Sequence, residues 1–158
     1  MSTALLTDRY ELTMVDTALH AGIAQRPSVF EVFARQLPAG RRYGVVAGLG
    51  RLVTALEHFR FDDATLGWLD DADVVRPATL DWLAAYRFRG ELTAYREGEL
   101  YVPGSPVLTV AAPFAHAVVL ETLLLSVLNH DSAIASAAAR VVSAAGGRGR
   151  SSGIWARK

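Results

Sequence analysis

The sequence contains no cysteine, and its 16 basic and 16 acidic side chains give a net charge of zero. The lack of cysteine excludes disulfides, a thiol nucleophile and a thiolate metal site, and it fits a protein of the cytoplasm. The lack of net charge removes the attraction that drives most non-specific binding to nucleic acid and acidic membranes. We therefore expect a cytoplasmic protein that has no nucleic-acid partner.

The sequence also lacks an uninterrupted apolar run long enough to cross a bilayer. Its most apolar stretch, residues 117–128, contains Glu121 and is shorter than the ~20 residues that a membrane helix needs. The first eleven residues include Asp8, Arg9 and Glu11, where a secretory signal would be apolar. We expect neither a secretory signal nor a membrane span, and we predict that the apolar stretch forms a buried helix.

Three familiar functional motifs are missing as well. The four histidines have no pair at metal-ligand spacing, so we predict no metal site. Gly44, Gly48 and Gly50 lack the third glycine of a dinucleotide-binding motif, because Val53 occupies that position. The only lysine is Lys158, which excludes a biotinyl or lipoyl carrier hairpin at the turns 97–98 and 103–104.

The sequence does contain enough apolar material for a folded core. Hydrophobic residues make up 51% of its 158 residues and charged residues only 20%. This composition is typical of a globular chain rather than a disordered one. The length fits one domain, or one domain and part of another.

The first predicted element is a helix near the N-terminus. Thr7 or Asp8 can cap a helix that begins near Arg9 and stops at Gly22. Glu11 follows Asp8 by three residues, which is the spacing of a capping box.

Changes in apolar periodicity predict the remaining elements. A period of three to four residues dominates the middle of the sequence, and a period of two begins at Gly90. The expected elements are a strand over 29–33, a loop over 40–44, helices over 49–59, 62–69 and 77–86, three antiparallel strands over 91–95, 100–102 and 107–110, and one helix over 114–145. These elements predict an α+β fold in which helices pack with a small, mainly antiparallel sheet.

Three polar residues, Asn129, His130 and Asp131, interrupt the last, apolar helix. Polar side chains in such a helix need partners or a cavity. Two interpretations remain open: a local helix break with Asp131 or Ser132 as a new cap, or a polar site that these residues face.

Several short motifs occur in a characteristic order and spacing. They are residues 7–14 (TDRYELTM), 33–38 (FARQLP), 47–49 (AGL), 88–90 (FRG), 97–104 (EGELYVPG) and 121–125 (ETLLL), which leads to Asn129. Across residues 3 to 148, this order resembles the N-terminal part of nicotinate phosphoribosyltransferase, a type II phosphoribosyltransferase. The first motif is the most specific of the set.

The resemblance implies a reaction, cofactors and partners. Family members join nicotinate to phosphoribosyl pyrophosphate to give nicotinate mononucleotide in NAD salvage, and they use ATP and Mg²⁺. They form homodimers in which the first motif of one subunit reaches the barrel of the other. By resemblance, Tyr10 stacks on the nicotinate ring and Asp8 is a polar residue of the same site. The local alternative makes Asp8 a helix cap and Tyr10 a half-buried aromatic residue.

The resemblance also predicts a division of the chain. We expect an N-terminal α+β domain over 1–113, a long helix over 114–147 that leads toward an α/β barrel, and an aberrant tail over 148–158. The family's catalytic groups lie in the barrel, so we predict that no catalytic residue is present and that the chain is inactive alone. The alternative function is a non-catalytic dimerisation or binding module.

The tail departs abruptly from the family pattern. After Arg148 the family continues into a strand and a Gly-x-Arg-Arg motif, whereas this chain reads GRSSGIWARK. We expect this ending to result from a shifted or interrupted reading frame.

Overall fold

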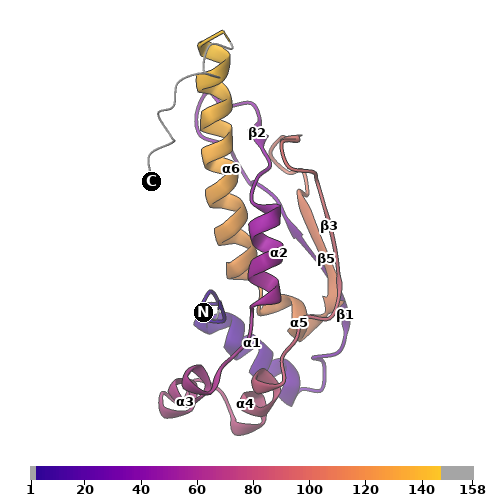
Figure 1. Cartoon of the computed structure of the whole chain (residues 1–158). Helices are drawn as coiled ribbons and strands as arrows, with labels where there is room; N and C mark the ends of the chain where they lie inside the picture. The colour runs from indigo at the N-terminus through magenta and orange to yellow at the C-terminus, as the bar shows by residue number, and fades with distance from the viewer. Residues whose placement is uncertain (1–2, 147–158) are drawn as a thin grey trace.

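The computed structural model describes residues 3–146 and has the α+β fold that the sequence predicts (Figure 1). The aberrant tail predicted over 148–158 lies outside the described residues. In chain order, the elements are α1 (Arg9–His20), β1 (Pro27–Val32), β2 (Gly44–Val45), α2 (Leu49–Glu57), α3 (Asp63–Asp71), α4 (Pro77–Ala84), β3 (Glu91–Ala94), β4 (Leu100–Tyr101), β5 (Leu108–Pro113), α5 (Phe114–Val118) and α6 (Glu121–Ala144).

The main sheet has the order β1-β5-β3, with β5 antiparallel to both neighbours. Val110 at its centre pairs with Phe30 on one side and Leu92 on the other. The alternation of buried and exposed residues along β5 buries Leu108, Val110 and Ala112 against the helices. The strand predicted at 29–33 is therefore confirmed as β1, with bounds shifted toward the N-terminus.

The three predicted strands are present as β3, β4 and β5, but β4 does not pair with its neighbours in the sequence. β3 pairs directly with β5, and the backbone N–H of Tyr95 donates to the carbonyl of Val107 (3.0 Å), which closes the base of a long loop. β4 lies in that loop and pairs with β2. β2 begins at Gly44, the last residue of the segment predicted as a loop. The pairing is tight because Gly44 lies against the Tyr101 ring, where a Cβ atom would not fit.

The helix starts follow the sequence signals in part. Asp62 caps α3 by accepting from the Thr65 N–H at 2.9 Å, and Pro77 stands in the first turn of α4. Asp8 is the N-cap residue of α1, but its side chain makes no capping bond. The predicted capping box is thus incomplete, because the half that the Asp8 side chain should supply is missing.

The single helix predicted over 114–145 is two helices. α5 ends at Val118, and α6 begins at Glu121 after a tight turn in which the Leu120 N–H donates to Ala117 O (3.1 Å). α5 packs on α1 and the main sheet, whereas α6 packs on α2 and β2. The chain must change direction to reach both sets of partners, and no glycine or proline in the sequence marks the change.

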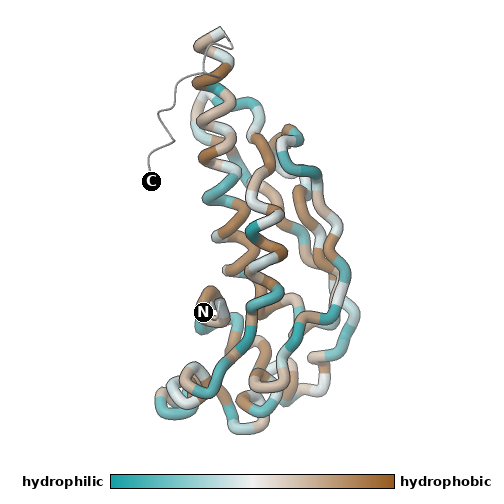
Figure 2. Tube along the Cα trace, viewed as in Figure 1, coloured by the Kyte–Doolittle hydropathy of each residue, from teal (hydrophilic) through white to brown (hydrophobic). Residues whose placement is uncertain are grey.

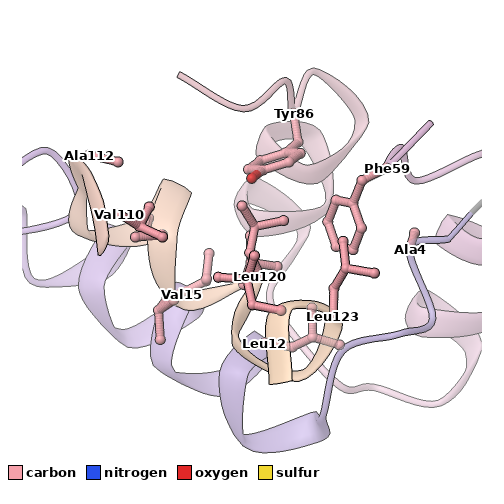
Figure 3. Packing of buried hydrophobic residues seen from close by; sticks show 14 of the residues in the cluster. Ala4, Leu12, Val15, Phe59, Tyr86, Val110, Ala112, Leu120 and Leu123 are labelled. Carbon is pink, nitrogen blue, oxygen red and sulfur yellow. The ribbon is translucent and has the colours of Figure 1, made fainter. Parts of the chain in front are cut away.

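The core lies where α1, α5, the start of α6 and β5 meet (Figure 3). Leu12 and Val15 of α1 pack with Leu120 and Leu123, all at most 4% exposed. By length and hydropathy, residues 114–144 could also cross a membrane, but half of their most apolar window is buried inside the protein. That burial is typical of a core helix.

Candidate functional site

A cavity of about 590 Å³ opens between the start of α1, the segment after β1 and the first half of α6. The segment after β1 contributes residues 33–36, which belong to one of the family-like motifs. From α6, the cavity is lined by Thr122, Leu125, Ser126, Leu128, Asn129 and Ser132. Elements far apart in the sequence therefore form one site.

The structure brings the two predicted site residues together on one wall of this cavity. Tyr10 is 46% exposed, so its ring is available to a ligand or partner. Partial burial and a hydrogen bond to Glu121 raise the pKa of the Tyr10 hydroxyl, so it stays protonated at neutral pH. Asp8 precedes the helix and, with no capping bond, keeps its carboxylate available.

Glu11 is buried behind this wall and connects the start of α1 to the start of α6. Its Oε1 accepts from the Thr122 N–H at 2.9 Å and from the Thr122 hydroxyl at 2.5 Å, and its Oε2 accepts from the Thr7 hydroxyl at 2.5 Å. Burial raises the pKa of the Glu11 carboxyl, while the hydrogen bonds from Thr122 and Thr7 act in the opposite direction. The first turn of α1 is thereby fixed to the first turn of α6.

The polar triplet in α6 does not break the helix, so the interpretation of Asp131 or Ser132 as a new cap is wrong. Asn129 lines the cavity, whereas Asp131 pairs with Arg51 of α2 at 2.7 Å. Hydrogen bonds from Arg51 and His130 lower the pKa of Asp131 to about 2. Only one member of the triplet therefore belongs to the site.

Sequence reasoning missed most of the α6 contribution. Thr122, Ser126, Asn129 and Ser132 recur every three to four residues in an otherwise apolar helix. Such a polar stripe on one helical face is a detectable signal. Ser132 also holds the segment before α2 in place, because its hydroxyl accepts from the Ala47 N–H at 3.1 Å.

The charges on the wall limit its chemistry. Asp8 and Arg35 are the charged residues among the described residues that line the cavity. Within residues 3–146, no group of three or more histidine, aspartate or glutamate side chains could hold a metal ion. The wall can thus contact a flat, polar ligand through aromatic, hydroxyl and amide groups, but it does not concentrate positive charge.

Comparisons with known proteins identify the family of this domain. The family model described as the nicotinate phosphoribosyltransferase (NAPRTase) N-terminal domain matches residues 5–129. A nicotinate phosphoribosyltransferase of Mycobacterium tuberculosis is 63% identical over 144 residues, which are 91% of this chain and 32% of that relative. The nicotinate phosphoribosyltransferase of Homo sapiens is 38% identical over 144 residues, 87% of this chain and 26% of that relative.

Solved structures give the same result. The crystal structure of human nicotinic acid phosphoribosyltransferase matches with a TM-score of 0.81 and 36% identity, over 89% of this chain and 28% of that one. A nicotinate-nucleotide pyrophosphorylase from Pyrococcus furiosus shares the fold, with a TM-score of 0.65 and 23% identity over 91% of this chain and 29% of that one. This chain spans about a quarter to a third of its relatives' length. By its matched domain, the chain belongs to the nicotinate phosphoribosyltransferase family.

Proposed function

We propose that this chain supplies the nicotinate-facing wall of a nicotinate phosphoribosyltransferase. The complete enzyme would join nicotinate to phosphoribosyl pyrophosphate with the help of ATP, and would release nicotinate mononucleotide and pyrophosphate. The observation that carries this proposal is the position of Tyr10 and Asp8 on one wall of the cavity. In this role the Tyr10 ring stacks on the pyridine ring, and Asp8 contacts its polar edge.

The reaction centre itself lies outside this wall. Transfer of a phosphoribosyl group passes through a cationic ribose and a departing pyrophosphate, which need preorganised positive charge. The single arginine on the wall, Arg35, and the lack of a metal-ligating cluster among residues 3–146 do not fit a site for Mg²⁺ and phosphates. ATP and Mg²⁺ would therefore bind to groups of a barrel domain, and we derive no catalytic step from this chain's own residues.

A dimer would complete the site. The wall is open, and three exposed large hydrophobic side chains line it: Tyr10, Phe33 and Leu125, each between 42% and 46% exposed. A second subunit that covers this wall would bury these side chains and bring the reacting phosphates to the nicotinate. The family homodimer offers such a surface.

A non-catalytic dimerisation or binding module is the second candidate function. The observation in its favour is exposed apolar side chains in the second half of α6, where Ile134 is 56% exposed and Val141 is 69% exposed. Figure 2 shows hydrophobic residues along this helix. A helix face of this kind usually packs against another protein surface. This function needs neither Asp8 nor Tyr10.

The two candidates are separated by a transplant, in which this chain replaces the matching third of the M. tuberculosis relative. We expect the transplant to form nicotinate mononucleotide. Tyr10→Ala should raise the KM for nicotinate by about fivefold, because loss of an aromatic contact removes on the order of 1 kcal/mol. Tyr10→Phe keeps the ring and should raise it much less.

Both variants need a stability control. If Tyr10→Ala and Tyr10→Phe lower the thermal stability equally and leave the kinetics unchanged, Tyr10 has only a structural role. The binding-module function would then be the better account of the chain.

A further inference from the structure

Glu11 is the one carboxylate in the described core that is completely shielded from solvent, at 0% exposure. It follows Tyr10 directly, and Tyr10 is 46% exposed. An ionised carboxylate in such a place is costly unless several donors satisfy it. The salt bridges found within residues 3–146 do not involve Glu11, so hydrogen bonds carry the compensation.

Those hydrogen bonds come from the start of α6. The N-cap residue of α6 is Leu120, whose side chain cannot accept a hydrogen bond. The first N–H groups of a helix have no partner within the helix, and Glu11 accepts one of them, the Thr122 N–H, at 2.9 Å. Glu11 thus caps a helix that begins 110 residues later in the chain, and the helix dipole favours its negative charge.

Two further hydrogen bonds strengthen this link. The Thr122 hydroxyl donates to the same Glu11 oxygen at 2.5 Å, and the Thr7 hydroxyl donates to the other oxygen at 2.5 Å. Glu11 therefore joins the segment just before the start of α1 to the first turn of α6. These contacts fix the distance between the two helix starts, and so they help to set where the Tyr10 ring and Asp8 lie.

We propose that Glu11 is a positioning residue, which locks the first turn of α1 onto α6 so that Asp8 and Tyr10 meet nicotinate in the correct geometry. This inference rests on the proposed function of the cavity. Glu11 does not reach the cavity itself, and it acts through Tyr10, Asp8 and Thr122. Small displacements of substrate-binding groups have large kinetic effects, so the loss of the hydrogen bonds between Glu11 and Thr122 should be measurable.

The test uses Glu11→Ala, Glu11→Gln and Thr122→Val in the transplant. We expect Glu11→Ala to raise the KM for nicotinate by about tenfold or more, with a smaller effect on the KM for phosphoribosyl pyrophosphate. Glu11→Gln should restore most of the affinity. Its amide oxygen still accepts from Thr122, and the Thr7 hydroxyl can turn to accept from the amide nitrogen. Thr122→Val, which keeps the N–H but removes the hydroxyl, should raise the KM by a smaller factor.

A core variant from the same turn separates positioning from stability. Leu12→Ala removes apolar contacts beside Glu11 and destabilises the fold, but it keeps the side chains that form the Glu11–Thr122 hydrogen bonds. The proposal is overturned if Leu12→Ala raises the KM for nicotinate as much as Glu11→Ala, or if Thr122→Val and Glu11→Ala leave it unchanged. If Glu11→Ala does not fold, a Thr122→Val protein with unchanged KM is sufficient to overturn it.

The outcome for Tyr10 keeps the two proposals apart. If Tyr10→Ala raises the KM for nicotinate and Glu11→Ala does not, the cavity binds nicotinate but Glu11 does not position it. If Tyr10→Ala has no effect, the proposed function of the cavity fails, and the positioning role of Glu11 fails with it.

Discussion

Three residues near the start of α1 have three different environments. Asp8 lies before the helix with a free carboxylate, Tyr10 extends over the cavity wall, and Glu11 points into the core. Successive residues of a helix are rotated by about 100° from one another, so one turn can serve the site and the core at the same time. This division lets a short motif both build a binding wall and hold it in place.

The Arg51–Asp131 pair gives a prediction for pH dependence. The pKa of Asp131 is lowered to about 2, first by its hydrogen bonds from Arg51. Because this value lies below that of an unfolded aspartate, the pair stabilises the fold above about pH 4 and loses its effect as the pH falls toward about 2. Asp131→Asn should lower the free energy of unfolding by about 0.2–1 kcal/mol near neutral pH, since Arg51 is half exposed and solvent screens the pair.

Urea unfolding at about pH 6 and about pH 3 measures this effect. The difference in the free energy of unfolding between the unchanged protein and Asp131→Asn should shrink at the lower pH, where Asp131 begins to be protonated. Asp71→Asn, a change at an exposed position, is the matched control and should show no such difference. A difference that stays constant over this pH range would contradict the assigned role of Asp131.

Local sequence rules explain only part of these residue environments. The motif TDRYELTM predicts that Asp8 and Tyr10 belong together, and they line one cavity. The same rules assign Glu11 to a capping box within α1, but its main partner is Thr122, 111 residues away. No rule based on local spacing encodes a contact between residues so far apart, and the fold decides it.

At the scale of elements, glycine fixes how α2 approaches α6. Gly48, the N-cap residue of α2, has a φ of 102°, which favours glycine. A Cβ atom there would lie 2.8 Å from Asp131 Oδ2 and 2.9 Å from Asp131 Cβ. Gly48→Ala should therefore lower the free energy of unfolding by about 1–3 kcal/mol through backbone strain and a steric clash.

Gly50, two residues later, is the matched control. It lies within α2, and no atom lies within 4 Å of the position that its Cβ would occupy. Gly50→Ala should be neutral or stabilise the fold by up to about 1 kcal/mol, because alanine favours the helix. Equal losses for both variants in chemical unfolding would show that close approach to α6 is not what requires Gly48.

The elements were predictable where a signal is local and not where pairing is distant. Pro77 and Asp62 mark the starts of α4 and α3 correctly. The turn at 97–98 was predicted too, but Glu97 has a long-range partner: its Oε1 accepts from the Leu49 N–H at 2.6 Å and so caps α2. This contact, together with the pairing of β4 with β2, holds the loop beside the start of α2.

At the scale of the whole molecule, we propose that the described residues provide a binding wall and that the reaction centre lies outside it. It matches the N-terminal domain of its family and spans about a quarter to a third of its relatives' length. The cavity has aromatic, hydroxyl and amide groups for a flat ligand, and Arg35 is the only basic residue among its described lining residues. The family reaction needs more positive charge than this wall provides, and removal of even one charge-stabilising donor slows catalysis by on the order of 10²-fold or more.

The most direct test of this account is a paired assay of nicotinate mononucleotide formation. The isolated chain and the transplant into the M. tuberculosis relative are supplied with nicotinate, phosphoribosyl pyrophosphate, ATP and Mg²⁺, with host enzyme excluded. We predict no turnover by the isolated chain, and turnover by the transplant that depends on Tyr10. Turnover by the isolated chain, or a folded transplant that forms no product, would contradict the claim that this chain provides the nicotinate-binding wall and not the reaction centre.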